Sequence, residues 1–96
     1  MNIRDIIWLE TVEDKIIGKH QVQPGEVEEA LFNRPHVRFV ERGHRQGEDL
    51  YAAFAQTDNG RYLAIYFILK SSRAALIGTA RDMTRKEIRS YGRKER

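Results

Sequence analysis

Residues 61–81 read Arg-Tyr-Leu-Ala-Ile-Tyr-Phe-Ile-Leu-Lys-Ser-Ser-Arg-Ala-Ala-Leu-Ile-Gly-Thr-Ala-Arg, and this stretch decides the fold. Residues 61–69 are apolar at nearly every position, which is typical of a strand at the centre of a sheet with both faces buried. The polar stretch 70–73 indicates a turn, and residues 74–81 predict the next strand. Because parallel strands need a much longer connection, we expect these two strands to pair antiparallel.

The predicted sheet extends from this hairpin toward the N-terminus. Asp58-Asn59-Gly60 is typical of a tight turn, because Asn and Gly tolerate positive φ. Before it, residues 50–57 predict a strand, and residues 36–42 predict another because apolar side chains alternate along them. Residues 3–9 are rich in β-branched side chains and predict a first strand.

Two helices are predicted between the first strand and the rest of the sheet. The segment 11–19 predicts a helix with Thr11 as its N-cap, because side chains recur at a spacing of four: Val12, Ile16 and His20. A second helix is expected to open at Pro24, since proline is favoured in the first helical turn, and to close at Asn33.

The last predicted element is a C-terminal helix. Thr84 and Glu87 form a T-x-x-E capping box, and Arg85 and Arg89 follow on one face at a spacing of four. The element order is therefore β-α-α-β-β-β-β-α, an α+β fold with a small antiparallel sheet, two N-terminal helices and one C-terminal helix. The length of 96 residues predicts a single domain, 1–96.

The bulk composition excludes several classes of protein. With 41% hydrophobic and 32% charged residues, the chain is expected to be globular rather than disordered. The absence of cysteine excludes a disulfide framework and a thiolate metal site. The longest apolar run, residues 62–69, is too short for a transmembrane helix, so we expect no membrane association and a cytoplasmic location.

Charge is distributed unevenly along the chain. Residues 1–32 carry three basic and seven acidic side chains, a balance of −4. Residues 33–80 carry seven basic and four acidic side chains (+3), and residues 81–96 carry seven and three (+4). The basic second half suggests a polyanionic partner, and a solvated surface tail explains the charge equally well.

No cofactor or metal motif is present, so any chemistry must come from His, Lys, Arg, Glu and Tyr. These residue types suffice to cleave RNA. A base removes the proton of the ribose 2′-OH, which attacks the adjacent phosphate. Arginines then stabilise the charge that develops on the phosphate, and an acid protonates the leaving 5′-oxygen.

Histidine exchanges protons near neutral pH, so His20, with the cation Lys19 next to it, is the first candidate for proton transfer. The alternative is that His20 only continues the apolar stripe of its helix. Arg81 ends an apolar strand, and strict alternation predicts that it shares a face with Ile77 and Thr79. Its alternative role is a salt bridge to Glu87 or Asp82.

Arg61 is a further candidate cation, and it follows the Asn59-Gly60 turn. Its alternative role is simply that of an exposed first residue of a strand. Trp8 and Tyr66 could stack on bases, but core packing is the better explanation for both because each lies in an apolar run.

Taken together, the ordered landmarks along nearly the whole chain resemble the BrnT toxin family within the RelE-like ribonuclease superfamily. The residues that carry the resemblance are Trp8, Lys15, Lys19-His20-Gln21-Val22, Glu26, Ala30-Leu31-Phe32, Pro35, Gly47-Glu48, Gly60-Arg61-Tyr62-Leu63, Ile77-Gly78-Thr79-Ala80-Arg81, Thr84-Arg85-Lys86-Glu87 and Tyr91. The chain departs from the family's pattern at Leu9-Glu10, at Gln21, and in the hairpin 68–75, where Lys70 or Arg73 could replace a family arginine.

The resemblance implies a RelE-like fold and a metal-independent endoribonuclease that inhibits translation. It also implies a cognate antitoxin, commonly a ribbon-helix-helix DNA-binding protein. In the toxin–antitoxin complex, only the antitoxin is then expected to contact operator DNA. Carried over residue by residue, the resemblance implies one active surface with the catalytic residues Lys19, His20, Arg61 and Arg81. RNA-binding residues are then expected at Arg73, Arg85, Arg89 and Tyr91. The alternatives are a non-catalytic RNA-binding module and a protein-interaction module.

Overall fold

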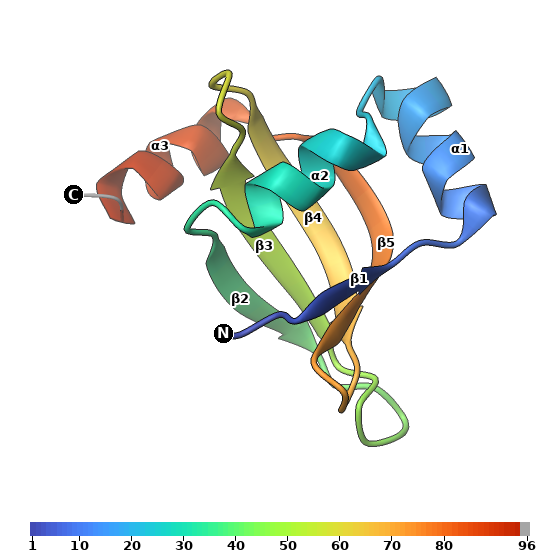
Figure 1. The fold of residues 1–96 in the computed structure, drawn as a ribbon. Coiled ribbons are helices and arrows are strands. Elements are labelled where there is room, and N and C mark those ends of the chain that lie inside the picture. Colours follow the sequence, from blue (N-terminus) through green and yellow to red (C-terminus); the bar gives the residue numbers. More distant parts are fainter. Residues whose placement is uncertain (95–96) are drawn as a thin grey trace.

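The computed structural model describes residues 1–94, with five strands and three helices in the predicted order (Figure 1). Residues 95 and 96 of the predicted domain lie outside the described residues. The α+β fold class is confirmed. The elements are β1 (Asp5–Ile7), α1 (Glu10–His20), α2 (Pro24–Leu31), β2 (His36–Glu41), β3 (Leu50–Gln56), β4 (Tyr62–Leu69), β5 (Ala74–Asp82) and α3 (Arg85–Lys94).

The five strands form one sheet in the order β1-β5-β4-β3-β2. Strands β2 to β5 pair antiparallel, as predicted, and β4 lies at the centre, where Ile65 pairs with Ala53 of β3 and Ala80 of β5. The expectation of a wholly antiparallel sheet is wrong at β1, which pairs parallel with β5. The two helices after β1 carry the chain away from it, so β1 is free to join the far edge of the sheet.

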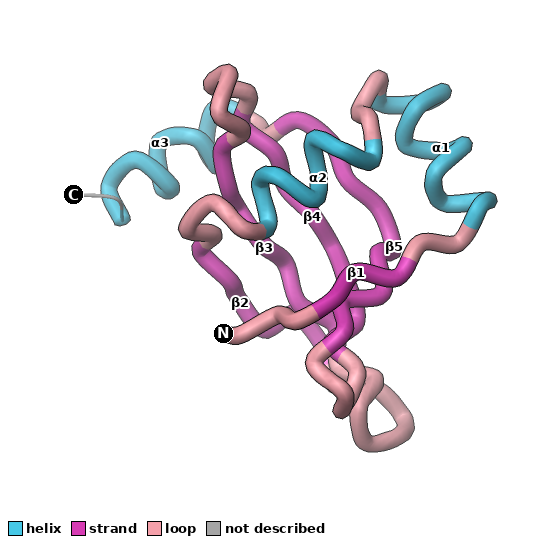
Figure 2. The backbone as a smooth tube through the Cα atoms, in the orientation of Figure 1, coloured by secondary structure: helices cyan, strands magenta, loops and turns pink. Residues whose placement is uncertain are grey.

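The sheet separates two layers of side chains. On one face, Leu63, Ile65 and Phe67 of β4 are fully buried against α1 and α2, which cross this face (Figure 2). On the other face, Ala64 and Tyr66 pack with residues of α3. Because alternate residues of a strand point to opposite faces, β4 supplies both layers.

A β-bulge in β5 changes which side chains share a face. Thr79 pairs with Tyr66 and Ile77 pairs with Phe67, so Gly78 is the extra, unpaired residue. Ile77 therefore lies on the α1/α2 face, whereas Thr79 points to the α3 face. The predicted common face of Ile77 and Thr79 is wrong for this reason. The Gly78 carbonyl accepts a hydrogen bond from Lys15 Nζ at 3.1 Å, which joins α1 to β5.

The helix ends agree with the sequence in two of three cases. The Thr84 backbone donates to Glu87 (2.8 Å) and the Glu87 backbone donates to Thr84 Oγ1 (3.2 Å), which confirms the predicted capping box. Helix α2 starts at Pro24, as expected. Helix α1 instead starts at Glu10 after Leu9, without a side-chain cap, so the predicted N-cap at Thr11 is wrong. Within the described part of the chain, no helix is both long and apolar enough to cross a membrane.

Candidate functional site

Arg81 lies near the end of β5, on the α3 face of the sheet, because it pairs with Ala64. Its Nη1 and Nη2 donate to the two carboxylate oxygens of Glu87 at 2.8 and 3.0 Å. Nη2 also donates to the Tyr66 hydroxyl at 3.3 Å, and the guanidinium carbon lies 5.7 Å from the centre of the Tyr66 ring. The salt bridge that the sequence left open as an alternative is thus present, and it holds the guanidinium in one orientation.

The ion pair keeps both of its members charged. The pKa of Glu87 is lowered from its ordinary value of 4.5 to about 2, mainly by the hydrogen bonds from Arg81 and also by a backbone hydrogen bond from Thr84. The pKa of Arg81 is raised, chiefly by its hydrogen bonds to Glu87. Glu87 is therefore a fixed carboxylate near neutral pH, and it cannot serve there as the acid that protonates a leaving group.

Acid is expected to remove the stabilisation that this pair provides. Because the pKa of Glu87 is lower in the folded chain than in the unfolded chain, its contribution is complete above about pH 5 and is lost as the pH falls toward about 2. We expect a loss of roughly 1–2 kcal/mol, since the pair is partly solvated. The measurement is the free energy of unfolding by urea at a series of pH values between 7 and 2.

The matched control for this prediction is Glu87→Gln, which cannot titrate. Its free energy of unfolding should be lower than that of the wild type at pH 7, and the difference between the two proteins should shrink as the pH falls. Parallel pH profiles for the two proteins would show that the pair does not stabilise the fold.

A second group of ion pairs is centred on Arg61. Its Nε donates to Asp82 Oδ1 at 2.8 Å and its Nη1 donates to Glu26 Oε1 at 2.9 Å. The guanidinium also donates to the backbone carbonyls of His20 and Gln21, at 3.3 and 2.8 Å. Arg61 thus joins the end of α1, the start of α2 and the end of β5. The pKa of Asp82 is lowered, mainly by its hydrogen bond from Arg61 and also by the charge of His20.

The four predicted catalytic residues do not share one surface. His20 and Arg61 lie together on the α1/α2 side, with Lys19 exposed beside His20 at the end of α1. Arg81 lies on the opposite face, beside Tyr66. The expectation of a single active surface is therefore wrong. The reason is local: Arg81 and Asp82 are neighbours in β5, so their side chains point to opposite faces and select different partners.

The predicted RNA-binding residues are also divided. Arg85 and Arg89 are exposed on α3, but Tyr91 is only 7% exposed and packs its ring edgewise against His36 and Tyr62. Tyr91 therefore packs mainly in the apolar layer under α3, and it also lines a pocket between β2, β3 and α3.

Arg73 lies in the β4–β5 turn, at the opposite end of the sheet from α3 (Figure 1). Its Nε donates to the Asn2 carbonyl at 3.0 Å, and its backbone has a φ of 72°. These contacts attach the N-terminal segment to the turn. Arg73 is therefore at the other end of the sheet from the arginines of α3, and its expected contact with RNA stays a prediction.

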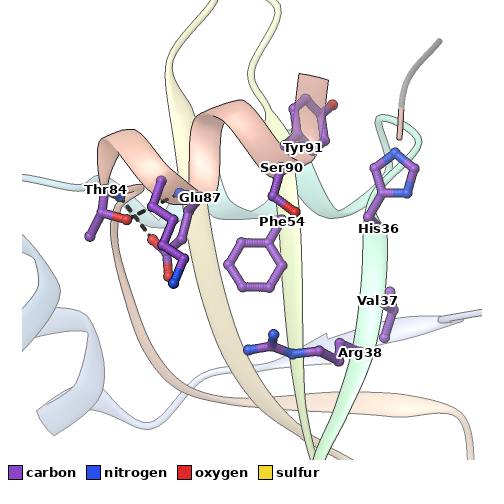
Figure 3. A pocket seen from close by; sticks show the side chains of 9 residues that line it. His36, Val37, Arg38, Phe54, Thr84, Glu87, Ser90 and Tyr91 are labelled. Carbon is purple, nitrogen blue, oxygen red and sulfur yellow. Dashed lines mark hydrogen bonds between the residues drawn. The ribbon is translucent and has the colours of Figure 1, made fainter. Parts of the chain in front are cut away.

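A pocket lies between β2, β3 and α3 (Figure 3), and the sequence did not single out His36, Arg38, Phe54 or Ser90 of its lining. The pocket has a volume of about 370 Å³. His36 and Arg38 enter it from β2 and Phe54 from β3, while Glu87 and Ser90 enter it from α3. The period-two spacing of His36 and Arg38 could have placed both on one face, but not the pocket, because the α3 residues that line its other wall are 48 or more residues away in the chain.

Two cross-strand rows connect this pocket to Arg81. His36 pairs with Phe54, Phe54 with Ala64, and Ala64 with Arg81, so all four lie in one row on the same face. The next row contains Arg38 and Tyr66, joined through Ala52. Glu87 both binds Arg81 and lines the pocket. We call the face formed by these two rows and α3 the α3-side face.

The comparisons with known proteins identify the fold. No protein-family model and no curated protein sequence matches the chain. Among solved structures, it is similar to the crystal structure of the Brucella abortus ribonuclease toxin BrnT, with a TM-score of 0.61 and 19% sequence identity. The similarity covers 88% of this chain and 100% of that one. The chain therefore has the fold of BrnT, as the resemblance in its sequence implied.

Proposed function

We propose that residues 1–96 form a single endoribonuclease toxin domain that cuts RNA at the α3-side face and so inhibits translation. The observation that carries the proposal is the geometry of Arg81. Its guanidinium is held by both oxygens of Glu87 and lies beside the Tyr66 hydroxyl on a sheet face that also carries Arg38 and His36. The fold likeness to a protein described as a ribonuclease toxin supports the same function.

In the proposed reaction, Arg81 stabilises the charge that develops on the phosphate when the 2′-oxygen attacks. Arginine suits this role because its planar fork donates several hydrogen bonds in fixed directions, and Glu87 keeps that fork oriented. The Tyr66 hydroxyl next to it accepts from Arg81 and can donate its own proton to an oxygen of the same phosphate. The 2′-hydroxyl gives up its proton to a base as its oxygen bonds to phosphorus. The bond between phosphorus and the 5′-oxygen breaks, and the 5′-oxygen takes up a proton from an acid, which leaves a 2′,3′-cyclic phosphate and a 5′-hydroxyl. The proposed reaction needs no metal ion.

We further propose that a cognate antitoxin neutralises this domain in the cytoplasm. The family resemblance supports a ribbon-helix-helix DNA-binding protein as the antitoxin, and the complex would then contact operator DNA only through that protein. The opposite charges of the two end segments of the chain, −4 for residues 1–32 and +4 for residues 81–96, are suited to two different partners.

The test is incubation of the purified chain with a defined messenger RNA in EDTA. We expect discrete fragments that end in 2′,3′-cyclic phosphate, and growth arrest when the chain is expressed without its antitoxin. RNA that is retarded in a gel but remains intact would instead support a non-catalytic RNA-binding module.

A further inference from the structure

The pocket between β2, β3 and α3 combines one aromatic wall with cations at its rim. Phe54 is half-buried and forms the wall. The guanidinium of Arg38 lies over its ring, with the carbon 5.4 Å from the ring centre. Arg38 and Lys86 are exposed, so both side chains can move to contact a ligand. A flat aromatic surface with cations beside it is the arrangement that binds single-stranded nucleic acid, because the bases stack on the ring and the cations attract the phosphates.

The volume and polar groups of the pocket also suit a small planar ligand. A volume of about 370 Å³ is within the range of small-molecule pockets and much too small for a folded partner. Ser90 on α3 supplies a hydroxyl that can donate to or accept from the edge of a ring. Figure 3 shows Ser90 and Arg38 on opposite sides of the Phe54 ring. The pocket therefore offers one surface for stacking and separate groups for hydrogen bonding.

The position of the pocket relates it to Arg81. Phe54 lies in the same cross-strand row as Arg81, with only Ala64 of β4 between them. Neighbouring strands are about 4.8 Å apart, so the backbones of Phe54 and Arg81 are roughly 10 Å apart, a separation that one nucleotide and the two side chains can span. Glu87 lines the pocket and binds Arg81, so the two positions are continuous.

We propose that this pocket binds one nucleobase of the RNA whose phosphate lies at Arg81, and that it sets the base preference of the chain. The proposal deepens the proposed function and rests on it for the identity of the substrate. The base lies flat against the Phe54 ring, in the place that the Arg38 guanidinium occupies in the free chain. The guanidinium then stacks on the outer side of the base.

The experiment measures binding of uncleavable oligonucleotides by fluorescence polarisation. The probes are fluorescein-labelled tetranucleotides with 2′-O-methyl riboses, which lack the attacking hydroxyl, and matched tetranucleotides with an abasic site at each position in turn. For the wild type, we expect one abasic position to weaken binding by about 5- to 100-fold, since stacking of a base on an aromatic side chain contributes that much.

The variant is Phe54→Leu, which keeps an apolar side chain and removes the flat ring. It should bind the intact tetranucleotide about as weakly as the wild type binds the abasic one, and the abasic site should cause no further loss. Phe39→Leu is the matched control. Phe39 is also a phenylalanine in a strand, but it pairs with Tyr51 and contacts its ring on the α1/α2 side of the sheet, away from the pocket. Thermal unfolding of both variants checks that they are folded.

The outcomes separate this proposal from the proposed function. Two binding results contradict the base pocket. In one, all abasic probes bind the wild type as tightly as the intact probe does; in the other, Phe54→Leu loses as much affinity for the abasic probe as for the intact probe. If the wild type cuts RNA in either case, the base pocket is wrong and the ribonuclease stands. If the base effect depends on Phe54 but ordinary RNA is not cut, the pocket stands and the ribonuclease is wrong.

Discussion

Replacing Arg81 by alanine is expected to slow RNA cleavage by about 100- to 1,000-fold, which is the usual cost of removing one group that stabilises a transition-state charge. Arg81 is the arginine whose guanidinium is held by a carboxylate and a tyrosine hydroxyl on the α3-side face. The measurement is the single-turnover rate with the protein in excess over RNA. Arg81→Lys keeps the charge but loses the planar fork, so it should recover only part of the rate.

Arg61→Ala is the matched control, because Arg61 is also an arginine with carboxylate partners, but on the opposite side of the sheet. Its removal should lower the melting temperature, since it joins α1, α2 and β5, and should leave the rate per folded molecule within a few fold of the wild type. The reverse result, a normal rate for Arg81→Ala and a strongly reduced rate for Arg61→Ala, would place the active surface beside His20 and Lys19 instead.

Replacing Phe67 by alanine is expected to lower the free energy of unfolding by about 3–5 kcal/mol, a large part of the 5–15 kcal/mol of a typical domain. Phe67 is 0% exposed in the centre of β4 and stacks on Tyr51, with ring centres 5.9 Å apart. Its removal leaves a cavity that the surrounding strands and helices cannot fill. Urea unfolding followed by circular dichroism measures the loss.

Phe39→Ala tests whether burial, rather than aromatic contact, causes this effect. The Phe39 ring also contacts Tyr51, with ring centres 5.8 Å apart, but Phe39 is 52% exposed. We therefore expect it to lose less than about 1 kcal/mol, because little apolar surface returns to water. Equal losses for the two variants would mean that the core does not depend on the buried ring of Phe67.

The sequence predicted the order and type of all the elements because their signals are local. The apolar run 62–69 defines a buried strand without reference to any other segment, and Asn59-Gly60 defines the turn before it. The capping box of Thr84 and Glu87 spans only four residues, and both of its hydrogen bonds are present. The two-layer core follows as well, since alternation along β4 divides its side chains between the faces.

For the site, the sequence named the basic residues but not their partners. It identified Arg81 and allowed a bond to Glu87, because the two are six residues apart in the chain. It placed Arg81 with His20 and Arg61 and overlooked Phe54 and Arg38, because those relations depend on strand pairing.

The sequence by itself thus determined the fold class, the helix and strand positions and the set of candidate cations. The tertiary structure alone decided that β1 joins β5 in parallel, that Gly78 forms a bulge, and that Arg81 faces away from Arg61. The physical reason is the same in each case. Helix caps, turns and periodicity depend on neighbours within a few residues, whereas the pairing register of distant strands depends on packing across the whole sheet, and a shift of one residue exchanges the two faces.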